Sequence, residues 1–409
     1  MKPTITLCMI VKDETHVIER CLRSVAPFID RYDITDTGST DGTPEKIKEI
    51  MDELGVSGEV YLSDWKGFGN HAGKIGSRTE SFRNADNKAD YAWVIDADDS
   101  LVGTLKLPDG DEPDSYSLKI KRGDFVWWRN QIFKTSSMWR YEGVLHEYAA
   151  CDTPDAKVKR LIGEYSIEAR TEGNRNVGIS PVEKYSRDAA TLSKALEDDP
   201  DNARYQFYLA QSYFDSQQWD KSLEEYQKRV DIGGWPEEVF YSMYRVAILR
   251  GIKNEPEMDI IRAFEDCYNY KPDRAEPLYQ ISRIYRAMGK PALAFMHAST
   301  GMGIPYPDND ILFIQEEIYK YALLDEIGAT AFYAGKPHMG YAACKRLIEE
   351  NIIPEEHRPR VQENLSSYIN IMKQMQQQQM MTNMDAQIAD LKRKQVNKQP
   401  AKKWKKKKK

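Results

Sequence analysis

The sequence predicts an α/β N-terminal domain with a Rossmann-like, mostly parallel sheet, followed by an all-α domain of helical repeats and a disordered Lys-rich tail. Three observations support this prediction. Strand and helix signals alternate over residues 5–95, helical periodicity dominates from residue 181, and residues 391–409 are basic without any acid. Alternation of strands and helices is typical of a parallel sheet with helices on both faces.

The N-terminal alternation is continuous. Strands are expected at residues 5–11, 32–35, 59–62 and 91–95, and helices at 14–25, 41–54 and 77–84. Pro44 suits the first turn of the second helix. The pattern then becomes β-rich over residues 116–121, 125–128, 131–134 and 158–162. We therefore expect this domain to span residues 1–175.

The second half contains an internal repeat. Leu209-Ala210 with Tyr213 matches Ile281-Ser282 with Tyr285, 72 residues later. This offset is close to two units of a tetratricopeptide-type repeat of about 34 residues. The copy between them, near residues 239–251, is degenerate. A repeat domain is expected over 176–355, and 356–409 is expected to hold a frayed Gln-rich helix and a disordered basic tail.

Composition excludes several classes of protein. The net charge of −6 combines eleven Lys and Arg in residues 391–409 with −17 in the rest, which argues against a general nucleic-acid binder. Five scattered cysteines without a C-x-x-C pair favour free thiols over a disulfide framework or zinc site. No signal peptide is evident, and no apolar run approaches the roughly 18 residues that span a bilayer. A soluble cytoplasmic protein is expected.

Acidic residues follow two of the predicted strands. Asp96-Ala97-Asp98 ends one strand and Asp36 ends another. Ligands bind at the carboxyl ends of strands in such sheets, and paired carboxylates hold a hard divalent cation that bridges to phosphate oxygens. Asp36 has two interpretations: it accepts hydrogen bonds from a nucleotide base or ribose, or it is a turn acid that caps the helix after it. Asp41 is a candidate cap of the next helix.

Three further residues are candidates for the same cleft. His146, at the end of an aromatic β segment, is either a structural histidine or a third metal ligand. Glu147 beside it is a candidate general base. Arg78, 18 residues before Asp96, either pairs with diphosphate oxygens or is a surface arginine. The glycine-rich residues 67–73 have the wrong spacing for a dinucleotide fingerprint.

Four motifs together closely resemble family 2 glycosyltransferases of the GT-A fold. They are TITLCMIVKDE at residues 4–14, DTGSTDGT at 36–43, DAD at 96–98 and GVLHE at 143–147. The second half resembles the subgroup in which helical repeats follow that domain, and the resemblance covers roughly residues 3–345. It departs at Asp13, where the family usually has Asn, and at Gly73 and Gly76, near Arg78.

The resemblance implies an inverting transfer of a hexose from a nucleotide-sugar, most often UDP-linked, with Mn²⁺ or Mg²⁺. Asp36 would bind the uracil, Asp96 would lie near the ribose, and Arg78 would contact the diphosphate. The metal ligands would be Asp98 and His146.

The resemblance also requires a carboxylate that takes the acceptor's proton. Glu147 is the first candidate and Asp124 the second. The acceptor, a glycan, protein or small molecule, is not visible in the sequence. The repeats are expected to bind a protein partner or form a homodimer. The Lys tail is interpreted as a solvated end, with contact to an anionic membrane as the alternative, and no specific nucleic acid is expected.

The sequence leaves two alternative functions. A non-catalytic scaffold with a decayed transferase domain is opposed by four intact residues: Asp36, Asp96, Asp98 and His146. A nucleotidyltransferase would need a basic glycine-rich loop after the first strand, and residues 12–14 do not form one.

Overall fold

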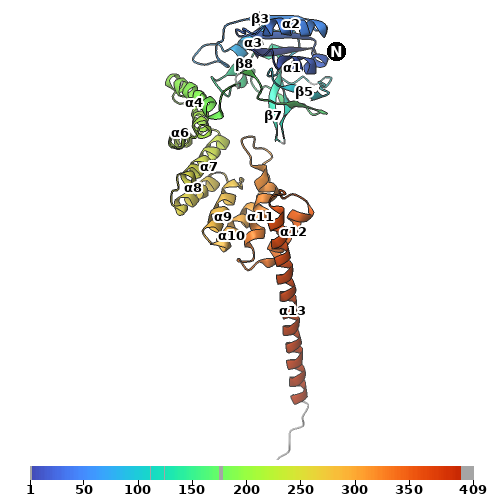
Figure 1. Ribbon diagram of the computed structural model, residues 1–409, viewed down its shortest axis with the longest axis vertical. Coiled ribbons are helices and arrows are strands. Elements are labelled where there is room, and N and C mark those ends of the chain that lie inside the picture. The colour runs from blue at the N-terminus through green and yellow to red at the C-terminus, as the bar shows by residue number, and fades with distance from the viewer. Residues whose placement is uncertain (1, 111, 124, 175–177, 398–409) are drawn as a thin grey trace, which may run out of the picture. The chain divides into compact units, whose positions relative to one another are not determined.

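The computed structural model describes residues 2–110, 112–123, 125–174 and 178–397 (Figure 1). The chain divides into two compact units, Met1–Ile232 and Gly233–Lys409. The first unit holds the α/β part and the first helices of the helical part. The domain boundaries predicted at residues 175 and 355 stay predictions.

A mixed sheet forms the centre of the first unit. Within the described residues it holds nine strands, in the order β3-β2-β1-β4-β7-β6-β11-β5 with β10 beside β6. Their bounds are β1 Ile5–Val11, β2 Arg31–Asp36, β3 Gly58–Leu62, β4 Tyr91–Val94, β5 Ser100–Gly103, β6 Ser115–Arg122, β7 Phe125–Lys134, β10 Val158–Arg160 and β11 Tyr165–Glu168. Strands β3, β2, β1 and β4 run parallel, whereas β7 is antiparallel to both β4 and β6. The predicted α/β fold with a mostly parallel sheet is confirmed.

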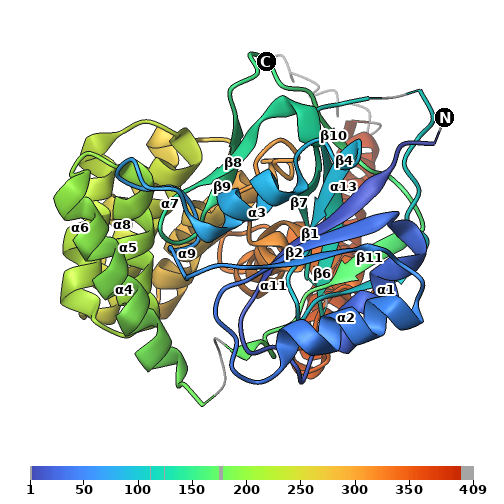
Figure 2. The same ribbon diagram turned by 90° about the horizontal axis from the view of Figure 1, so that it is seen from above.

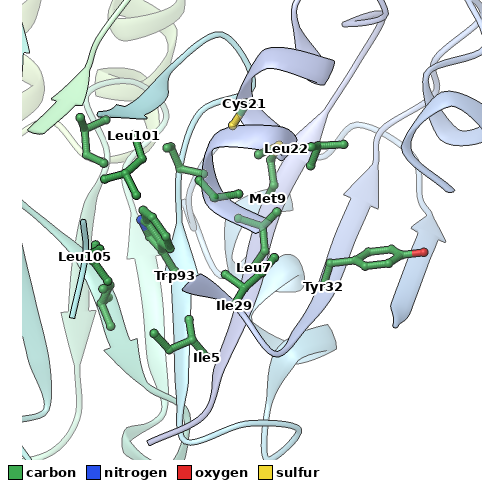
Figure 3. Packing of buried hydrophobic residues seen from close by; sticks show 14 of the residues in the cluster. Ile5, Leu7, Met9, Cys21, Leu22, Ile29, Tyr32, Trp93, Leu101 and Leu105 are labelled. Atoms are coloured by element: carbon green, nitrogen blue, oxygen red, sulfur yellow. The ribbon is translucent and has the colours of Figure 1, made fainter. Parts of the chain in front are cut away.

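Helices cover both faces of this sheet (Figure 2). Helices α1 (Ile18–Val25) and α2 (Thr43–Glu53) pack on one face and α3 (Ser77–Ala85) on the other. Alternation along β1 separates the two cores, since successive side chains of a strand point to opposite faces. Leu7 and Met9 join the larger core with Trp93 (Figure 3), whereas Cys8 packs with Phe82 of α3. A two-stranded sheet, β8 (Trp139–Glu142) with β9 (Tyr148–Cys151), follows.

The helical part begins at residue 181. Its α-helices are α4 Pro181–Asp198, α5 Ala203–Asp215, α6 Trp219–Ile232, α7 Pro236–Ile252, α8 Glu257–Tyr270, α9 Glu276–Ala287, α10 Pro291–Met302, α11 Leu323–Thr330, α12 Pro337–Glu349 and α13 Arg358–Asn397. The Gln-rich stretch lies inside the continuous helix α13, and the end of the Lys tail, 398–409, lies outside the described residues. No helix among the described residues is long and apolar enough to cross a membrane.

The 72-residue repeat has a structural counterpart in two helical hairpins. In α5/α6 the Ser222 hydroxyl donates to the Ala210 carbonyl at 2.9 Å. In α9/α10 the Ser282 hydroxyl donates to the Ala294 carbonyl, also at 2.9 Å. The same two positions make the same contact, with serine and alanine exchanged between the helices. Small residues at both positions let the two helices approach closely. The copy with the degenerate sequence forms the hairpin α7/α8.

A buried carboxylate ties β2 to its neighbours below the edge of the sheet that carries Asp36. Asp33 is fully buried and accepts hydrogen bonds from Arg31 at 2.8 and 2.9 Å and from Thr6 at 2.7 Å. Lys88 and Tyr61 add bonds at 3.0 and 3.1 Å. Burial by itself raises the pKa of Asp33, but these partners outweigh it and hold the pKa below its usual value.

We expect Asp33→Asn to lower the free energy of unfolding by about 2–4 kcal/mol at pH 7, because it leaves Arg31 and Lys88 without their anionic partner. The folded-state pKa lies below the unfolded value of about 3.9. The carboxylate therefore stabilises the fold fully above that pH, and its contribution falls as the pH drops below it. Urea unfolding should show a smaller difference at pH 3 than at pH 7. Asp52→Asn on the exposed side of α2 is the control and should change the value by less than about 0.5 kcal/mol.

Candidate functional site

A cavity of about 570 Å³ lies at the carboxyl edge of the sheet. Val11 at the end of β1 pairs with Asp36 at the end of β2, and Asp96 follows β4. Because these strands run parallel, their exits meet at this edge. Val11, Thr37, Asp96 and Asp98 all belong to the cavity or its rim. The edge predicted from the two acidic strand ends is the one where the cavity forms.

Asp36 is engaged with its own turn. Its carboxylate is buried and accepts hydrogen bonds from the backbone N–H of Gly38 at 3.1 Å and of Ser39 at 3.0 Å, and from the Ser39 hydroxyl. Asp41 accepts from the backbone N–H of Thr43 at 3.0 Å, at the start of α2. Asp36 thus binds its own turn and, among the described residues, makes no hydrogen bond to α2, whereas Asp41 binds the first residue of that helix. Recognition of a nucleotide by Asp36 stays a prediction.

Arg78 links two of the predicted site carboxylates. Its side chain is 15% exposed, and its guanidinium lies 2.8 Å from Asp96 and 2.7 Å from Glu147. Arg129 of β7 reaches the second oxygen of Asp96 at 3.3 Å. Burial works against ionisation of Asp96, but the two guanidinium groups prevail and hold the pKa of Asp96 well below its usual range. The structure thus brings Arg78, Asp96 and Glu147 together.

Glycines of the loop before α3 place Arg78. A Cβ on Gly69 would lie 2.7 Å from the Gly143 carbonyl oxygen, and one on Gly76 would lie 2.4 Å from Gly69. The loop can therefore pair with the chain at residues 141–143, where the Gly69 N–H donates to the Gly143 carbonyl at 3.1 Å. The Arg78 N–H donates to the Phe68 carbonyl at 2.9 Å. Gly76, which departs from the family pattern, is thus part of the support of Arg78.

Asp98 is held by residues 170–174, which we call the cover segment. One oxygen of Asp98 accepts hydrogen bonds from the backbone N–H groups of Glu172 and Gly173, both at 3.0 Å. Arg20 of α1 fastens the segment, because its guanidinium lies 2.6 Å from the Glu172 carboxylate and donates to the Asp98 carbonyl at 2.9 Å. One carboxylate oxygen of Asp98 is therefore engaged by two backbone amides of a loop.

Two more acids lie under the cover segment. Asp99 is buried and accepts from the Arg170 N–H at 3.0 Å. Burial and the neighbouring Asp96 raise the pKa of Asp99 to about 7. Glu14 accepts from the Asn174 N–H at 3.3 Å, and burial, followed by the charge of Asp98, raises its pKa to about 7. The sequence reasoning assigned neither acid a role.

His146 is exposed and lies on the helical side of its loop. Its ring stacks on Tyr208 of α5 with centroids 3.8 Å apart and planes 6° apart. Its carbonyl accepts from the Arg204 guanidinium at 2.8 and 3.1 Å. In the part of the chain that the structure describes, no three His, Cys, Asp or Glu side chains form a group able to hold a metal. Asp124, the second candidate base, lies outside the described residues.

The carboxylates of this rim nevertheless fit one kind of metal site. Mg²⁺ is commonly held by one or two protein carboxylates together with substrate phosphates and water. Asp98 supplies such a carboxylate, and Arg78 is a guanidinium suited to phosphate oxygens. A cage of three protein ligands is not required for a cation that binds together with a diphosphate.

Sequence reasoning missed Arg129, the second cation at Asp96, and several residues that line the cavity. Arg129 escaped notice because β7 joins this part of the sheet through its antiparallel pairing with β4. Trp65 and Phe68, whose rings lie 4.7 Å apart edge to face, also line the cavity. Their signal was present in the Trp-Lys-Gly-Phe run before the glycines.

The fold and the cavity define an α/β domain with an acidic, arginine-paired rim at the carboxyl ends of its strands. Residues 6–104 match the family described as glycosyl transferase family 2, which confirms the predicted resemblance for this segment. A TPR repeat-containing protein of Synechococcus elongatus is 28% identical over 158 residues, 35% of this chain and 34% of that protein. The chain thus matches about a third of the length of this curated relative.

Solved structures show weaker similarity. The crystal structure of MamA has a TM-score of 0.33 at 15% identity, covering 43% of this chain and 96% of that one. The crystal structure of YrrB, described as a TPR protein with an unusual peptide-binding site, has a TM-score of 0.31 at 14% identity, with 47% and 85% covered.

A double-mutant cycle should reveal the coupling between Arg78 and Asp96. We expect Arg78→Gln to lower the free energy of unfolding by about 3 kcal/mol, because it leaves Asp96 and Glu147 without their shared cation. The double variant Arg78→Gln/Asp96→Asn should lose about 1–3 kcal/mol less free energy of unfolding than the two single variants lose when their losses are added. Urea unfolding of the four proteins measures this coupling. Arg83→Gln, on the exposed side of the same helix, is the control, and additive effects would contradict the interpretation.

Proposed function

We propose that the N-terminal domain, residues 1–175, is a metal-dependent inverting glycosyltransferase that moves a hexose from a UDP-sugar to a nucleophile, such as a hydroxyl group, on a glycan, protein or small molecule. The observation that carries the proposal is the position of Asp98 and Arg78 on one cavity at the strand ends, within the family-matched segment. A carboxylate for a cation and a guanidinium for phosphate oxygens are what a nucleotide diphosphate requires.

Each residue has a proposed task. Asp98 holds Mn²⁺ or Mg²⁺ and His146 joins it, which requires His146 to leave Tyr208. The metal, when bound, supplies Lewis-acid stabilisation of the leaving diphosphate. Arg78 exchanges part of its contact with Asp96 for hydrogen bonds to the diphosphate. The released oxygen of Asp96 can then accept a hydrogen bond from the ribose. Asp36 recognises the uracil at the end of β2.

The proton of the acceptor needs a base. Glu147 is the proposed base, with Asp124 second. Glu147 lies 2.7 Å from the Arg78 guanidinium, so a shift of Arg78 toward the diphosphate would release it. Donor binding and activation of the base would then depend on the same arginine.

A non-catalytic role is the alternative. It is supported by the curated relative, whose name records TPR repeats alone, and by the engagement of Asp36 and Asp98 with backbone amides. In that case the helical repeats would bind a protein partner or a second copy of the chain. A cytoplasmic location is part of both proposals.

Hydrolysis of UDP-sugars separates the two functions. We expect release of UDP from UDP-glucose or another UDP-hexose in the presence of Mn²⁺, and a loss of at least about a hundredfold in Asp98→Asn, in line with the rate effects of electrostatic groups at a reacting centre. Coupled detection of UDP measures the rate. Asp64→Asn, an exposed acid outside the cavity, should retain the full rate. A protein that binds no UDP-sugar by calorimetry with Mn²⁺ present would refute the enzyme.

The cover segment competes with a cation for Asp98. We therefore expect Arg20→Ala, which unfastens the segment, to tighten Mn²⁺ binding about threefold to tenfold, the equivalent of roughly one hydrogen bond of about 1 kcal/mol. Mn²⁺ titration followed by electron paramagnetic resonance, with UDP present, measures the affinity. Arg23→Ala is the matched control, because Arg23 lies on the same helix and pairs with Glu19 and Glu53 instead. An unchanged affinity in Arg20→Ala would show that the segment does not compete.

A further inference from the structure

The second unit contains a cavity of its own, of about 840 Å³, walled by α9, α11 and α13. Its volume falls in the range of small-molecule sites. Its polar and aromatic lining consists of two tyrosines, three arginines, two acids, a histidine and an asparagine: Tyr279, Tyr333, Arg283, Arg286, Arg360, Asp325, Glu326, His357 and Asn364. None of them belongs to the site proposed above, and the resemblance assigned a role to none of them.

Two ion pairs form one wall of the cavity. Arg286 binds Glu326 through two hydrogen bonds of 2.8 and 2.9 Å, and Arg360 binds Asp325 through two of 3.1 and 2.7 Å. Such paired contacts fix both planar groups in orientation. Because Asp325 and Glu326 are neighbours on α11, the wall presents two oriented guanidinium–carboxylate pairs whose charges cancel.

Aromatic rings accompany these pairs. Tyr279 is half-buried with the Arg283 guanidinium over its ring, and Tyr333, whose ring contacts Phe332 edge to face, is 65% exposed. A tyrosine offers an apolar ring face and a hydroxyl on the same side chain. The cavity therefore combines apolar ring faces with groups that donate hydrogen bonds, on arginine, and groups that accept them, on the carboxylates.

This combination selects among ligands by charge and polarity. A polyanion meets one arginine, Arg283, that is not engaged in these two ion pairs, because Arg286 and Arg360 are each compensated by a carboxylate. An apolar peptide would cover the ion pairs without replacing their hydration, which is costly. A sugar suits the wall better, because its hydroxyls both donate and accept and its C–H faces pack on aromatic rings.

We propose that this cavity is a carbohydrate-binding site that takes one or two neutral sugar units of an acceptor or product glycan. The identity of that glycan rests on the proposed transferase function, whereas the binding itself does not. A second sugar site on the chain would hold the acceptor at a high effective concentration between transfer events.

The test is saturation-transfer NMR on the full chain with the methyl glycosides of glucose, galactose, mannose and N-acetylglucosamine and their disaccharides, followed by calorimetry on the best binder. We expect Tyr333→Ala to weaken that binding at least tenfold. Tyr270→Ala is the matched control, because Tyr270 is a 44% exposed tyrosine of α8 outside the cavity. Asp325→Asn is a second variant and should also weaken binding. Thermal unfolding checks that each variant is folded.

Asp98→Asn separates this proposal from the transferase proposal. It should abolish UDP-sugar hydrolysis while sugar binding at the helical cavity stays unchanged. Sugar binding that is lost in Tyr333→Ala supports the site even if no UDP-sugar is hydrolysed. The proposal is overturned if no saccharide of the panel binds, if Tyr333→Ala binds as tightly as wild type, or if only peptides bind this cavity.

Discussion

The ion pairing of Asp96 with Arg78 and Arg129 is the interaction on which the rim of the sheet depends. Asp96, Asp98 and Asp99 leave one buried strand within four residues, and like charges so close repel one another. Two guanidinium groups remove most of that repulsion at Asp96, and one of them also reaches Glu147. The arginine in turn depends on two glycines, which let its loop pack against the chain before Glu147.

The three acids meet three different environments. Asp96 is paired with two arginines, and Asp98 accepts hydrogen bonds from backbone amides of the cover segment. Asp99 is buried without an adequate counter-charge, and its pKa therefore rises to about 7. Among these three acids, only Asp98 can exchange its present partners for a cation without leaving a buried charge unpaired. Its partners are amide N–H groups, which water can hydrate once they are released. This difference favours Asp98 over Asp96 as the ligand of an incoming metal, on grounds independent of the family resemblance.

Local pattern predicted the fold well and the site only in part. The bounds predicted for β1 agree with the observed ones because its apolar run is continuous. The 72-residue offset between Leu209 and Ile281 corresponds to two helical hairpins in the structure, because small residues recur where the paired helices touch. Arg129 and the cover segment could not be predicted, since both reach the acids through pairings between distant parts of the chain. The stacking of His146 on Tyr208 likewise depends on a helix more than 60 residues further along the sequence.

The arrangement at Asp98 has a consequence for the order of binding under the proposed function. A single carboxylate that already accepts two hydrogen bonds is a poor site for a lone hydrated cation. A cation that arrives with a diphosphate brings its own oxygen ligands and offers Arg78 a second anion. The metal and the nucleotide should therefore bind cooperatively. The affinity for each ligand then rises in the presence of the other by the same factor, because the coupling is reciprocal.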